Sequence, residues 1–421
     1  MTSRHGHSLL SLSYTLLLYF ISPLLLTLTV VQALRTRDSR YLRQRFGFYQ
    51  RTQFPKPVWI HAASVGEVIA AEPLVHSLKK RFPQIPIIVT TGTPAGGEVA
   101  RLRLAETIDH AYLPIDFPGA VRRFLRQIKP ACALIMETEL WLNLYRTCST
   151  MNIAVLLING RLSSRTLNAQ HLLHHFYATT LASVDMILAR SATDKDGFVA
   201  LGASPDRVKV IGNIKFAAAA NETSAQPVIS RPYVLMASTH DNEELRILKL
   251  WKTQQRRHLL VIAPRHPDRL TDILKQLQPL SDNIAVRSRN DPVSSQTEVY
   301  IVDTVGELTM FMASADLVFM GGSLVRSGGH NILEPARLGK TIVFGPHMDN
   351  FLDESEVLLA HGAAIQISDD EELKACLARL LESKEERDEV GARAQSLVQQ
   401  YQDVAERYVD EIEARCNLSY D

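Results

Sequence analysis

Short apolar runs alternate with amphipathic stretches along most of the chain, and this alternation constrains the fold more than any other feature. Continuous runs of Val, Ile and Leu are typical of strands buried on both faces, and the stretches between them have helical spacing. The sequence therefore predicts an α/β fold with parallel sheets covered by helices. The expected strands lie at 58–63, 85–91, 111–116, 131–138, 153–160, 184–190, 233–239, 258–264, 298–303, 315–321 and 340–345.

The alternation is interrupted between residues 217 and 232, where the chain is small, polar and proline-containing. Such a stretch is typical of a linker between domains. We therefore expect one doubly wound, Rossmann-like domain over 35–216 and a second over 233–400. A long charged helical pattern runs from about 371 to 415, and we expect a C-terminal helix over 401–421. Ligands bind such sheets at the carboxyl ends of strands, so the facing cleft of two domains is the expected site.

Charge and cysteine content exclude several classes of protein. The 46 basic and 45 acidic residues leave no overall charge that would favour nucleic acid as a partner. The four cysteines form no CxxC pair and no zinc spacing with histidine, so we expect free thiols in a reducing compartment. One Asp-x-Asp pair, Asp194 and Asp196, resembles the metal-binding pair of some nucleotide-sugar enzymes. It lies in what looks like an ordinary exposed helix start, so we predict no metal site.

No charged residue occurs between Ser8 and Leu34. As one helix this stretch would be about 40 Å long, enough to cross a hydrocarbon core of about 30 Å. A cleaved signal peptide is the main alternative, but its apolar region is usually about 7–15 residues long. Five arginines follow the stretch and only Arg4 precedes it, which places the rest of the chain in the cytoplasm by the positive-inside rule. We expect residues 1–34 to be an uncleaved, single-pass membrane anchor.

Glu67 stands three residues after Ser64, just past an expected strand. That spacing matches a capping box, in which Ser64 caps the next helix and the glutamate accepts a hydrogen bond from the Ser64 amide. A carboxylate at a strand end, with no side chain on the neighbouring Gly66, is also a suitable general base for an alcohol. From spacing alone the capping interpretation is favoured, and the catalytic interpretation stays open.

Other strand ends in the first half also carry charge. Glu137 and Glu139 stand at the end of an expected strand, either as partners of a helix dipole or as acid–base or charge-stabilising groups. The sequence NGRLS follows the next strand. Lys215 comes after a Gly-Asn turn just before the linker. A lysine there is usually a solvated surface group, and the alternative is contact with an anionic substrate.

In the second half, Arg265 and His266 follow an expected strand, and the planar fork of arginine suits phosphate oxygens. The richest stretch is FMGGSLVRSGGHNILEP (319–335). Its glycines would let a phosphate approach the backbone, and a helix N-terminus would offer free amides. Glu334 can accept ribose hydroxyls or can form a capping arrangement with Asn331. Because two glycine pairs and His-Asn-x-x-Glu occur together, we favour a ligand site, although the pattern is not GxxxxGK[ST].

Seven motifs occur in one order within residues 58–346: ASVGEV, TTGTPAGG, ETELW, NGRLS, GNIKF, APRHPDR and GGSL-x-x-x-GGHN-x-LEPA. With the N-terminal apolar stretch, they closely resemble the 3-deoxy-D-manno-octulosonic acid (Kdo) transferases of lipopolysaccharide synthesis. The resemblance implies the glycosyltransferase B fold, with an acceptor-binding first domain and a CMP-sugar-binding second domain. It implies inverting transfer from CMP-Kdo to a lipid A precursor, lipid IVA, at the bacterial inner membrane. It also implies no metal and no other cofactor.

The same resemblance implies roles for individual residues. Glu67 is the implied proton acceptor, and Glu137 and Lys215 are the implied charge-stabilising groups. The implied CMP contacts are Pro264, Arg265, Gly306, Glu307, Leu308, Asn331, Ile332, Leu333 and Glu334.

The chain departs from the family pattern beside three of these motifs. Leu142 and Arg326 stand where proline is usual, and Ala217 stands where an acidic residue is common. Two other functions remain as alternatives, a UDP-sugar-dependent lipid glycosyltransferase of the same fold and a non-catalytic, membrane-anchored nucleotide-binding protein. The joint presence of the three charged groups named above argues against the second. An epimerase of the same fold would have no need of an anchor.

Overall fold

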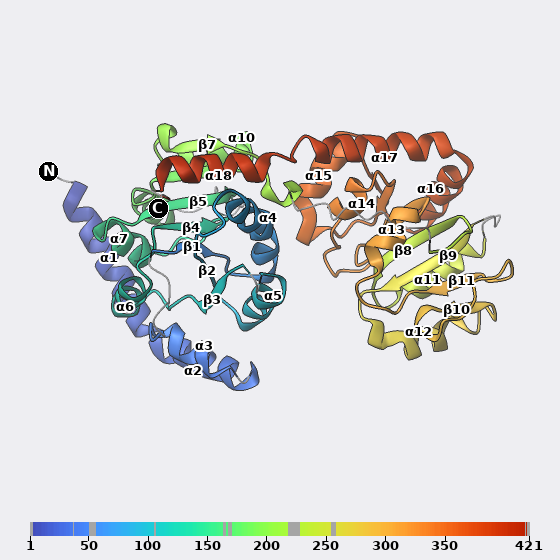
Figure 1. Ribbon diagram of the computed structural model, residues 1–421, viewed down its shortest axis with the longest axis horizontal. Coiled ribbons are helices and arrows are strands. Elements are labelled where there is room, and N and C mark those ends of the chain that lie inside the picture. The colour runs from blue at the N-terminus through green and yellow to red at the C-terminus, as the bar shows by residue number, and fades with distance from the viewer. Residues whose placement is uncertain are drawn as a thin grey trace. The chain divides into compact units, whose positions relative to one another are not determined.

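The computed structural model describes residues 3–36, 38–49, 56–104, 107–162, 166, 171–217, 228–253, 258–416 and 418. The chain forms two compact units (Figure 1). Unit 1 contains Met1–Ala219 and Tyr401–Asp421, and unit 2 contains Ala220–Gln400. Most of the expected linker lies outside the described residues. Each unit has its own buried core.

Unit 1 is built on a seven-stranded parallel sheet in the order β3-β2-β1-β4-β5-β6-β7. Its strands are β1 Val58–His61, β2 Ile87–Thr91, β3 Asp109–Tyr112, β4 Cys132–Met136, β5 Ala154–Gly160, β6 Met186–Ala189 and β7 Val208–Val210. Its helices are α1 Ser3–Phe20, α2 Ser22–Thr36, α3 Ser39–Arg45, α4 Val65–Arg81, α5 Pro94–Leu104, α6 Pro118–Ile128, α7 Leu142–Thr150, α9 His171–Leu181, α10 Ala192–Ala200, η1 Pro205–Arg207, η2 Ile214–Ala217 and α18 Val404–Arg415.

Helices cover both faces of this sheet, so alternate strand residues enter two different cores. In β1, Val58 and Ile60 belong to one apolar cluster, whereas Trp59 belongs to the other. All three are fully buried. This arrangement explains why the strands appear in the sequence as continuous apolar runs, because neither face needs polar side chains.

Unit 2 repeats the plan with a parallel sheet in the order β10-β11-β9-β8-β12-β13-β14. Its strands are β8 Tyr233–Thr239, β9 Leu259–Pro264, β10 Ile284–Val286, β11 Val299–Ile301, β12 Leu317–Met320, β13 Ile342–Phe344 and β14 Ile365–Gln366. Its helices are α11 Glu243–Trp251, η3 Pro267–Arg269, α12 Leu270–Leu277, η4 Arg287–Arg289, α13 Leu308–Ser314, α14 Leu333–Arg337, η5 Asp349–Phe351, α15 Leu352–Ala360, α16 Asp370–Glu382 and α17 Lys384–Gln399.

In both sheets the chain order reverses near the middle, and in unit 2 it also reverses at one edge, where β11 lies between β9 and β10. The reversal lies between β1 and β4 in unit 1, and between β8 and β12 in unit 2. At such a switch point the connections leave toward opposite faces, which opens a crevice at the carboxyl ends of the two strands where ligands bind. The fold therefore identifies one candidate site in each unit.

The C-terminal helix α18 packs on unit 1, beside α4 and β5 (Figure 1). Val404, Val409 and Ile412 are buried in the same apolar cluster as the β1 side chains. The Tyr408 hydroxyl donates a hydrogen bond to the carbonyl of Gly212 at 2.9 Å. The long charged pattern of the sequence is thus divided among three helices, α16, α17 and α18, and the last of them completes the core of unit 1.

The N-terminal apolar stretch is two helices, α1 and α2, bent by 54°. Pro23 explains the break, because proline has no amide proton and its ring clashes with the carbonyl four residues earlier. The single straight span expected from the sequence is therefore not confirmed. Within the described residues no single helix is long and apolar enough to cross a membrane, although the bent pair together reaches that length and composition.

One side of the α1–α2 pair packs on unit 1. The Tyr14 hydroxyl donates to Asp116 Oδ2 at 3.0 Å, and the Thr15 hydroxyl donates to Asn143 Oδ1 at 3.1 Å. Leu18 is buried with apolar residues around Phe117. The opposite side is exposed and apolar, and we call it the apolar face. Its residues are Leu12, Leu16, Leu17, Tyr19, Phe20, Leu24, Leu26, Leu28, Val31 and Leu34.

Candidate functional site

Glu67 lies at the switch point of unit 1, in the first turn of α4 after β1. Ser64 caps this helix, since its hydroxyl accepts a hydrogen bond from the Glu67 amide at 3.3 Å. The Glu67 carboxylate in turn accepts hydrogen bonds from the Ala63 amide at 2.8 Å and the Ser64 hydroxyl at 3.0 Å. The capping arrangement is therefore present, with one correction: the amide that the carboxylate binds belongs to Ala63 and not to Ser64.

The environment of Glu67 is also that of a base. Burial, assisted by the charges of Glu137 and Glu139, raises the pKa of Glu67 to about 7, against the opposing effect of the hydrogen bonds from Ala63 and Ser64. A base is most effective when its pKa is close to the working pH, because it is then both ionised and able to hold a proton. Capping and catalysis are therefore compatible at this residue.

Glu137 lies directly after β4, the strand next to β1. Its backbone has a positive φ of 53°, which is unfavourable for a glutamate, and its amide donates to the Ile158 carbonyl at 2.8 Å. The carboxylate faces two cations. Lys215 Nζ is 3.8 Å from Oε1, and Arg161 Nε is 2.9 Å from Oε2. The strained backbone thus aims a carboxylate at a small cluster of charges.

Lys215 is held in place by asparagine side chains. Asn213 Oδ1 accepts the Lys215 amide at 3.1 Å, and Asn159 Oδ1 accepts the Ile214 amide at 3.1 Å. The Lys215 side chain is only 19% exposed. It therefore lies against Glu137 and is not the solvated surface group that such a position usually holds.

Arg161 was not among the predicted site residues. It follows β5 within the NGRLS motif, and its side chain pairs with Glu137. The only signal in the sequence was its position after a strand end, because nothing in the spacing shows that β5 lies next to β4. In the described residues, Glu137 thus pairs with Lys215 and Arg161, and it lies near enough to Glu67 for its charge to raise the Glu67 pKa.

In unit 2, the predicted nucleotide contacts surround the ends of β9 and β12. Pro264 is the buried last residue of β9, and the next residue, Arg265, is exposed. The Arg265 amide donates to the carbonyl of Thr239, which ends β8, at 3.0 Å. At Gly306 the backbone has a φ of +90°, and a side chain there would meet open space. Gly306 therefore serves the turn.

The segment Glu307–Leu308 begins α13. The guanidinium of Arg287 donates two hydrogen bonds to the Glu307 carboxylate, at 2.7 and 3.1 Å, and lowers the pKa of Glu307. Thr309 of α13 donates to the Glu334 carboxylate in α14. Two of the three predicted stretches, 306–308 and 331–334, are thereby joined through one hydrogen bond between neighbouring helices.

The proposed cap of α14 differs from the expectation. Asn331 Oδ1 accepts the Leu333 amide at 3.1 Å, while Glu334 binds Thr309 and does not pair with Asn331. Ile332 and Leu333 are buried. The helix has only five residues, so its aligned peptide dipoles offer less to an anion than the sequence led us to expect.

The glycines of the second pair are needed for packing and for backbone conformation. Gly328 and Gly329 have φ of +85° and +71°. A side-chain carbon on Gly328 would lie 2.5 Å from the Asn350 amide, and one on Gly329 would collide with Met348. Protein atoms therefore occupy the place of a side chain at both positions, which accounts for the two glycines, and their role toward a phosphate stays a prediction.

A buried carboxylate fixes the switch point of unit 2. Glu243 is fully buried, and its oxygens accept hydrogen bonds from the amides of His240 at 2.9 Å, Gly322 at 2.7 Å and Leu324 at 3.0 Å. These amides belong to the segments that follow β8 and β12. No local pattern marks Glu243, because its three partners contribute only backbone amides and two of them are distant in the chain.

The first aspartate of the Asp-x-Asp pair has a structural role. Asp194 is buried and accepts hydrogen bonds from Arg190 Nε at 2.8 Å, the Ser191 hydroxyl at 2.6 Å and the Leu162 amide at 2.9 Å. Asp196 is exposed. In the part of the chain that the structure describes, no three potential metal-ligating side chains form a group.

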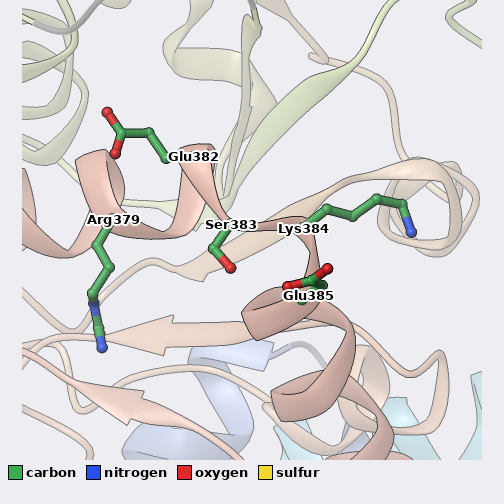
Figure 2. A pocket seen from close by; sticks show the side chains of 5 residues that line it. All are labelled: Arg379, Glu382, Ser383, Lys384 and Glu385. Carbon is green, nitrogen blue, oxygen red and sulfur yellow. The ribbon is translucent and has the colours of Figure 1, made fainter.

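A polar hollow of about 560 Å³ lies where α16 meets α17 (Figure 2). Its lining consists of Arg379, Glu382, Ser383, Lys384 and Glu385. These residues come from the end of one helix and the start of the next, and the Arg379 and Lys384 side chains extend away from each other (Figure 2). The hollow contains none of the predicted site residues.

Comparison with known proteins shows the family to which the chain belongs. Residues 40–218 match the family model for 3-deoxy-D-manno-octulosonic acid transferase (Kdo transferase). The chain is 32% identical to the 3-deoxy-D-manno-octulosonic acid transferase of Haemophilus influenzae over 414 residues, 94% of this chain and 96% of that protein. It is 34% identical to the Bordetella pertussis protein of the same name over 331 residues, 74% of this chain and 76% of that protein.

A solved structure shows the same architecture. The UDP-GlcNAc 2-epimerase of Neisseria meningitidis covers 85% of this chain and 100% of its own, with a TM-score of 0.59 and 14% identity. The two parallel sheets and this likeness define the class as a glycosyltransferase B-like α/β fold. Within that class, the chain belongs to the Kdo transferase family. It is a glycosyltransferase that transfers Kdo in lipid A and lipopolysaccharide biosynthesis.

Proposed function

We propose that this transferase moves Kdo from CMP-Kdo to lipid IVA with inversion, and that Glu67 is the general base. The observation that carries the proposal is the convergence of Glu67, Glu137 and Lys215 at the switch point of unit 1. A buried carboxylate with a pKa near 7 beside a fixed carboxylate–cation pair is suited to deprotonating an alcohol and stabilising developing charge.

In the proposed reaction, ionised Glu67 takes the proton of an acceptor hydroxyl. The acceptor oxygen forms a bond to the anomeric carbon of Kdo, and the bond from that carbon to the phosphate oxygen breaks on the opposite face. CMP leaves with the electron pair of that bond. Glu137 faces the positive charge that develops on the sugar, and Lys215 and Arg161 balance the negative charges of the site.

Unit 2 is proposed to bind the CMP part of the donor. The support is the exposed guanidinium of Arg265 after β9, the open turn at Gly306 and the linked stretches around Glu334. The proposed CMP contacts are the nine residues from Pro264 to Glu334 that the family resemblance implies. A guanidinium can make two hydrogen bonds to phosphate oxygens, which suits a nucleotide better than a neutral sugar.

We also propose that α1 and α2 hold the protein on the cytoplasmic side of the bacterial inner membrane. The apolar face offers the side chains, and Arg35, Arg40 and Arg43 nearby are exposed. Arginines at the membrane surface are attracted by anionic lipids. Because the other side of the helix pair is already packed on unit 1, insertion of the apolar face into one leaflet is favoured over a crossing.

The test is to incubate the purified protein with lipid IVA and either CMP-Kdo or a UDP-sugar, and to weigh the product. Growth of the lipid by the mass of Kdo, only with CMP-Kdo, is the expected result. Transfer from the UDP-sugar alone would show that the donor is a UDP-sugar and not CMP-Kdo. CMP binding without transfer from either donor would favour the non-catalytic alternative.

A further inference from the structure

Two histidines of unit 2 meet end to end. His240 follows β8, and His330 follows the second glycine pair. Their Nε2 atoms are 2.8 Å apart, their ring centres are 5.0 Å apart, and their planes differ by only 12°. The distance between the ring centres is about equal to the Nε2–Nε2 distance plus the distance from each ring centre to its own Nε2. The two Nε2 atoms therefore lie between the ring centres, and the rings lie end to end. The bond requires one protonated Nε2 and one bare Nε2.

The fold builds this contact at the switch point of unit 2. Gly322, after β12, has a φ of +68°, and a side-chain carbon there would lie 3.1 Å from the His330 ring and 3.2 Å from the His240 ring. Glu243 holds the amides of both His240 and Gly322. Both rings remain partly exposed. The glycine and the buried glutamate therefore leave a ring pair open to a ligand.

The groups around the pair are mostly basic. His266 stands nearly perpendicular to His240, with ring centres 5.9 Å apart. Arg265 and Arg269 are close enough to disfavour further positive charge on His240. Desolvation lowers the pKa of His240, and desolvation with the neighbouring His240 and Arg265 lowers the pKa of His330 to about 4. The free pair is therefore uncharged at neutral pH.

The acidic groups near the pair are already engaged. Glu244 accepts hydrogen bonds from the Thr239 hydroxyl and from Arg269, each at 3.0 Å. Asp241 accepts from Arg269 at 3.1 Å. Glu243 is buried and binds three amides, as described above. Arg269 is therefore paired with carboxylates, whereas Arg265 has no ion-pair partner among the described residues and is the cation left to meet an anion beside the histidines.

We propose that the His240–His330 pair binds an oxyanion of the nucleotide-sugar donor and takes up one proton as it does so. In the neutral pair one Nδ1 carries a proton and the other is bare. The added proton goes to the bare Nδ1, so both outer nitrogens become donors while the inner hydrogen bond is kept. His240 Nδ1 lies 3.4 Å from the Ser327 hydroxyl, so His330 Nδ1 is the nitrogen that donates to the oxyanion. The inference rests on the proposed function, because it adds two residues to the donor site next to Arg265.

The direction of the pH effect follows from this geometry. The anion offsets the nearby positive charges, so the pKa of the pair is higher in the complex than in the free protein. Binding therefore strengthens as the pH falls below the pKa of the complex, by at most about tenfold per pH unit for one linked proton. A pair that only ties two loops together would give no such slope.

The test is calorimetry with cytidine 5′-(methyl phosphate), a phosphodiester whose charge is constant between about pH 5 and pH 8, the range in which histidine titrates. Titrations in two buffers with different ionisation heats measure proton uptake. The wild type is expected to take up a proton and to bind more tightly at low pH. His240→Gln and His330→Gln should remove both effects, whereas His361→Gln, at an exposed histidine of the same unit, should change neither.

Each outcome decides a different point. If the wild type binds the phosphodiester with no proton uptake and no pH slope, or if the two variants keep the uptake, the inference is wrong and the proposed function stands. If the wild type binds no cytidine ligand, the proposed donor fails and the inference with it. A parallel titration with free Kdo separates the phosphate from the sugar carboxylate as the bound oxyanion. Histidine ¹⁵N shifts of the wild type report the same proton if the variants do not fold.

Discussion

The Glu67 carboxylate binds the Ala63 amide and the Ser64 hydroxyl, and it also lies near two other glutamates. Glu67→Gln separates its two roles, because glutamine keeps an acceptor oxygen but takes no proton from an alcohol. We expect the turnover to fall about 10²–10⁴-fold with the fold and CMP affinity retained. Product mass against time and CMP calorimetry measure both quantities.

Ser64→Ala is the matched control for that substitution. It removes the acceptor of the Glu67 amide, so the unfolding free energy should fall by about 0.5–2 kcal/mol while much of the turnover is kept. If Glu67→Gln retains more than about a tenth of wild-type turnover, the base lies elsewhere and Glu67 only caps the helix. Glu137 is then the next candidate.

The pKa of Glu67 predicts the pH dependence of the reaction. Only the ionised carboxylate accepts a proton, so kcat/KM should rise with pH through about 7 and level off above it. Glu137→Gln removes a negative charge that raises this pKa, so the midpoint should move to lower pH whatever happens to the absolute rate. A rate that stays unchanged between about pH 8 and pH 5 would contradict the assignment.

The site residues show what the sequence could predict at this scale. Strand ends indicate where charged side chains can serve a ligand and mark Glu67, Glu137 and Lys215 as candidates, whereas the roles expected of these residues come from the family resemblance. Their contact depends on the order β1-β4-β5 in the sheet, which no local pattern reveals, and for that reason Arg161 was missed. The packing role of the second glycine pair could not be predicted, because Asn350 and Met348, which adjoin the two glycines, are distant from them in the sequence.

At the scale of elements, the apolar face of α1 and α2 is the basis of the membrane proposal. Leu24→Glu with Leu28→Glu should weaken binding to vesicles of phosphatidylethanolamine and phosphatidylglycerol. A carboxylate in lipid costs up to about 2.5–3.5 kcal/mol. Folding should be unaffected, because these side chains are 60% and 57% exposed. Vesicle flotation measures the binding.

Leu102→Glu is the control for this pair of changes, since Leu102 is a leucine of α5 that is 82% exposed and lies outside the apolar face. It should float with vesicles as the wild type does. Unchanged flotation of the double variant would mean that the apolar face does not touch lipid.

The strands that the sequence pattern failed to predict are short edge strands. The long central strands were predicted to within a few residues because burial on both faces makes them continuous apolar runs. Three edge or near-edge strands of two or three residues, β7, β10 and β14, were not predicted, since such short strands carry too few side chains to set a period. Pro23 indicates a helix break in the sequence. The break was not predicted, because the residues on both sides of Pro23 form one uncharged, apolar stretch.

At the scale of the whole molecule, the two units should respond separately to a cytidine ligand. A ligand at 100 times its Kd stabilises what it binds by about 2.7 kcal/mol. We expect CMP to slow amide hydrogen exchange around β8, β9 and β12 of unit 2. We expect no change in amide exchange in the sheet of unit 1. Arg265→Ala should remove the protection, and Arg379→Ala, in the polar hollow of Figure 2, should keep it. Protection confined to α16 and α17 would move the nucleotide to that hollow.

The return of α18 to unit 1 sets the order in which the protein can be completed on the ribosome. Unit 2 has all its residues once Gln400 has emerged, whereas unit 1, synthesised first, still lacks Val404, Tyr408 and Ile412 of its own core. Unit 1 is therefore synthesised first but completes its fold last. Its sheet keeps an apolar surface exposed until all of unit 2 has been synthesised. A chain that terminates before α18 keeps that apolar surface exposed. We expect chaperones and proteases to bind such a truncated chain at this surface.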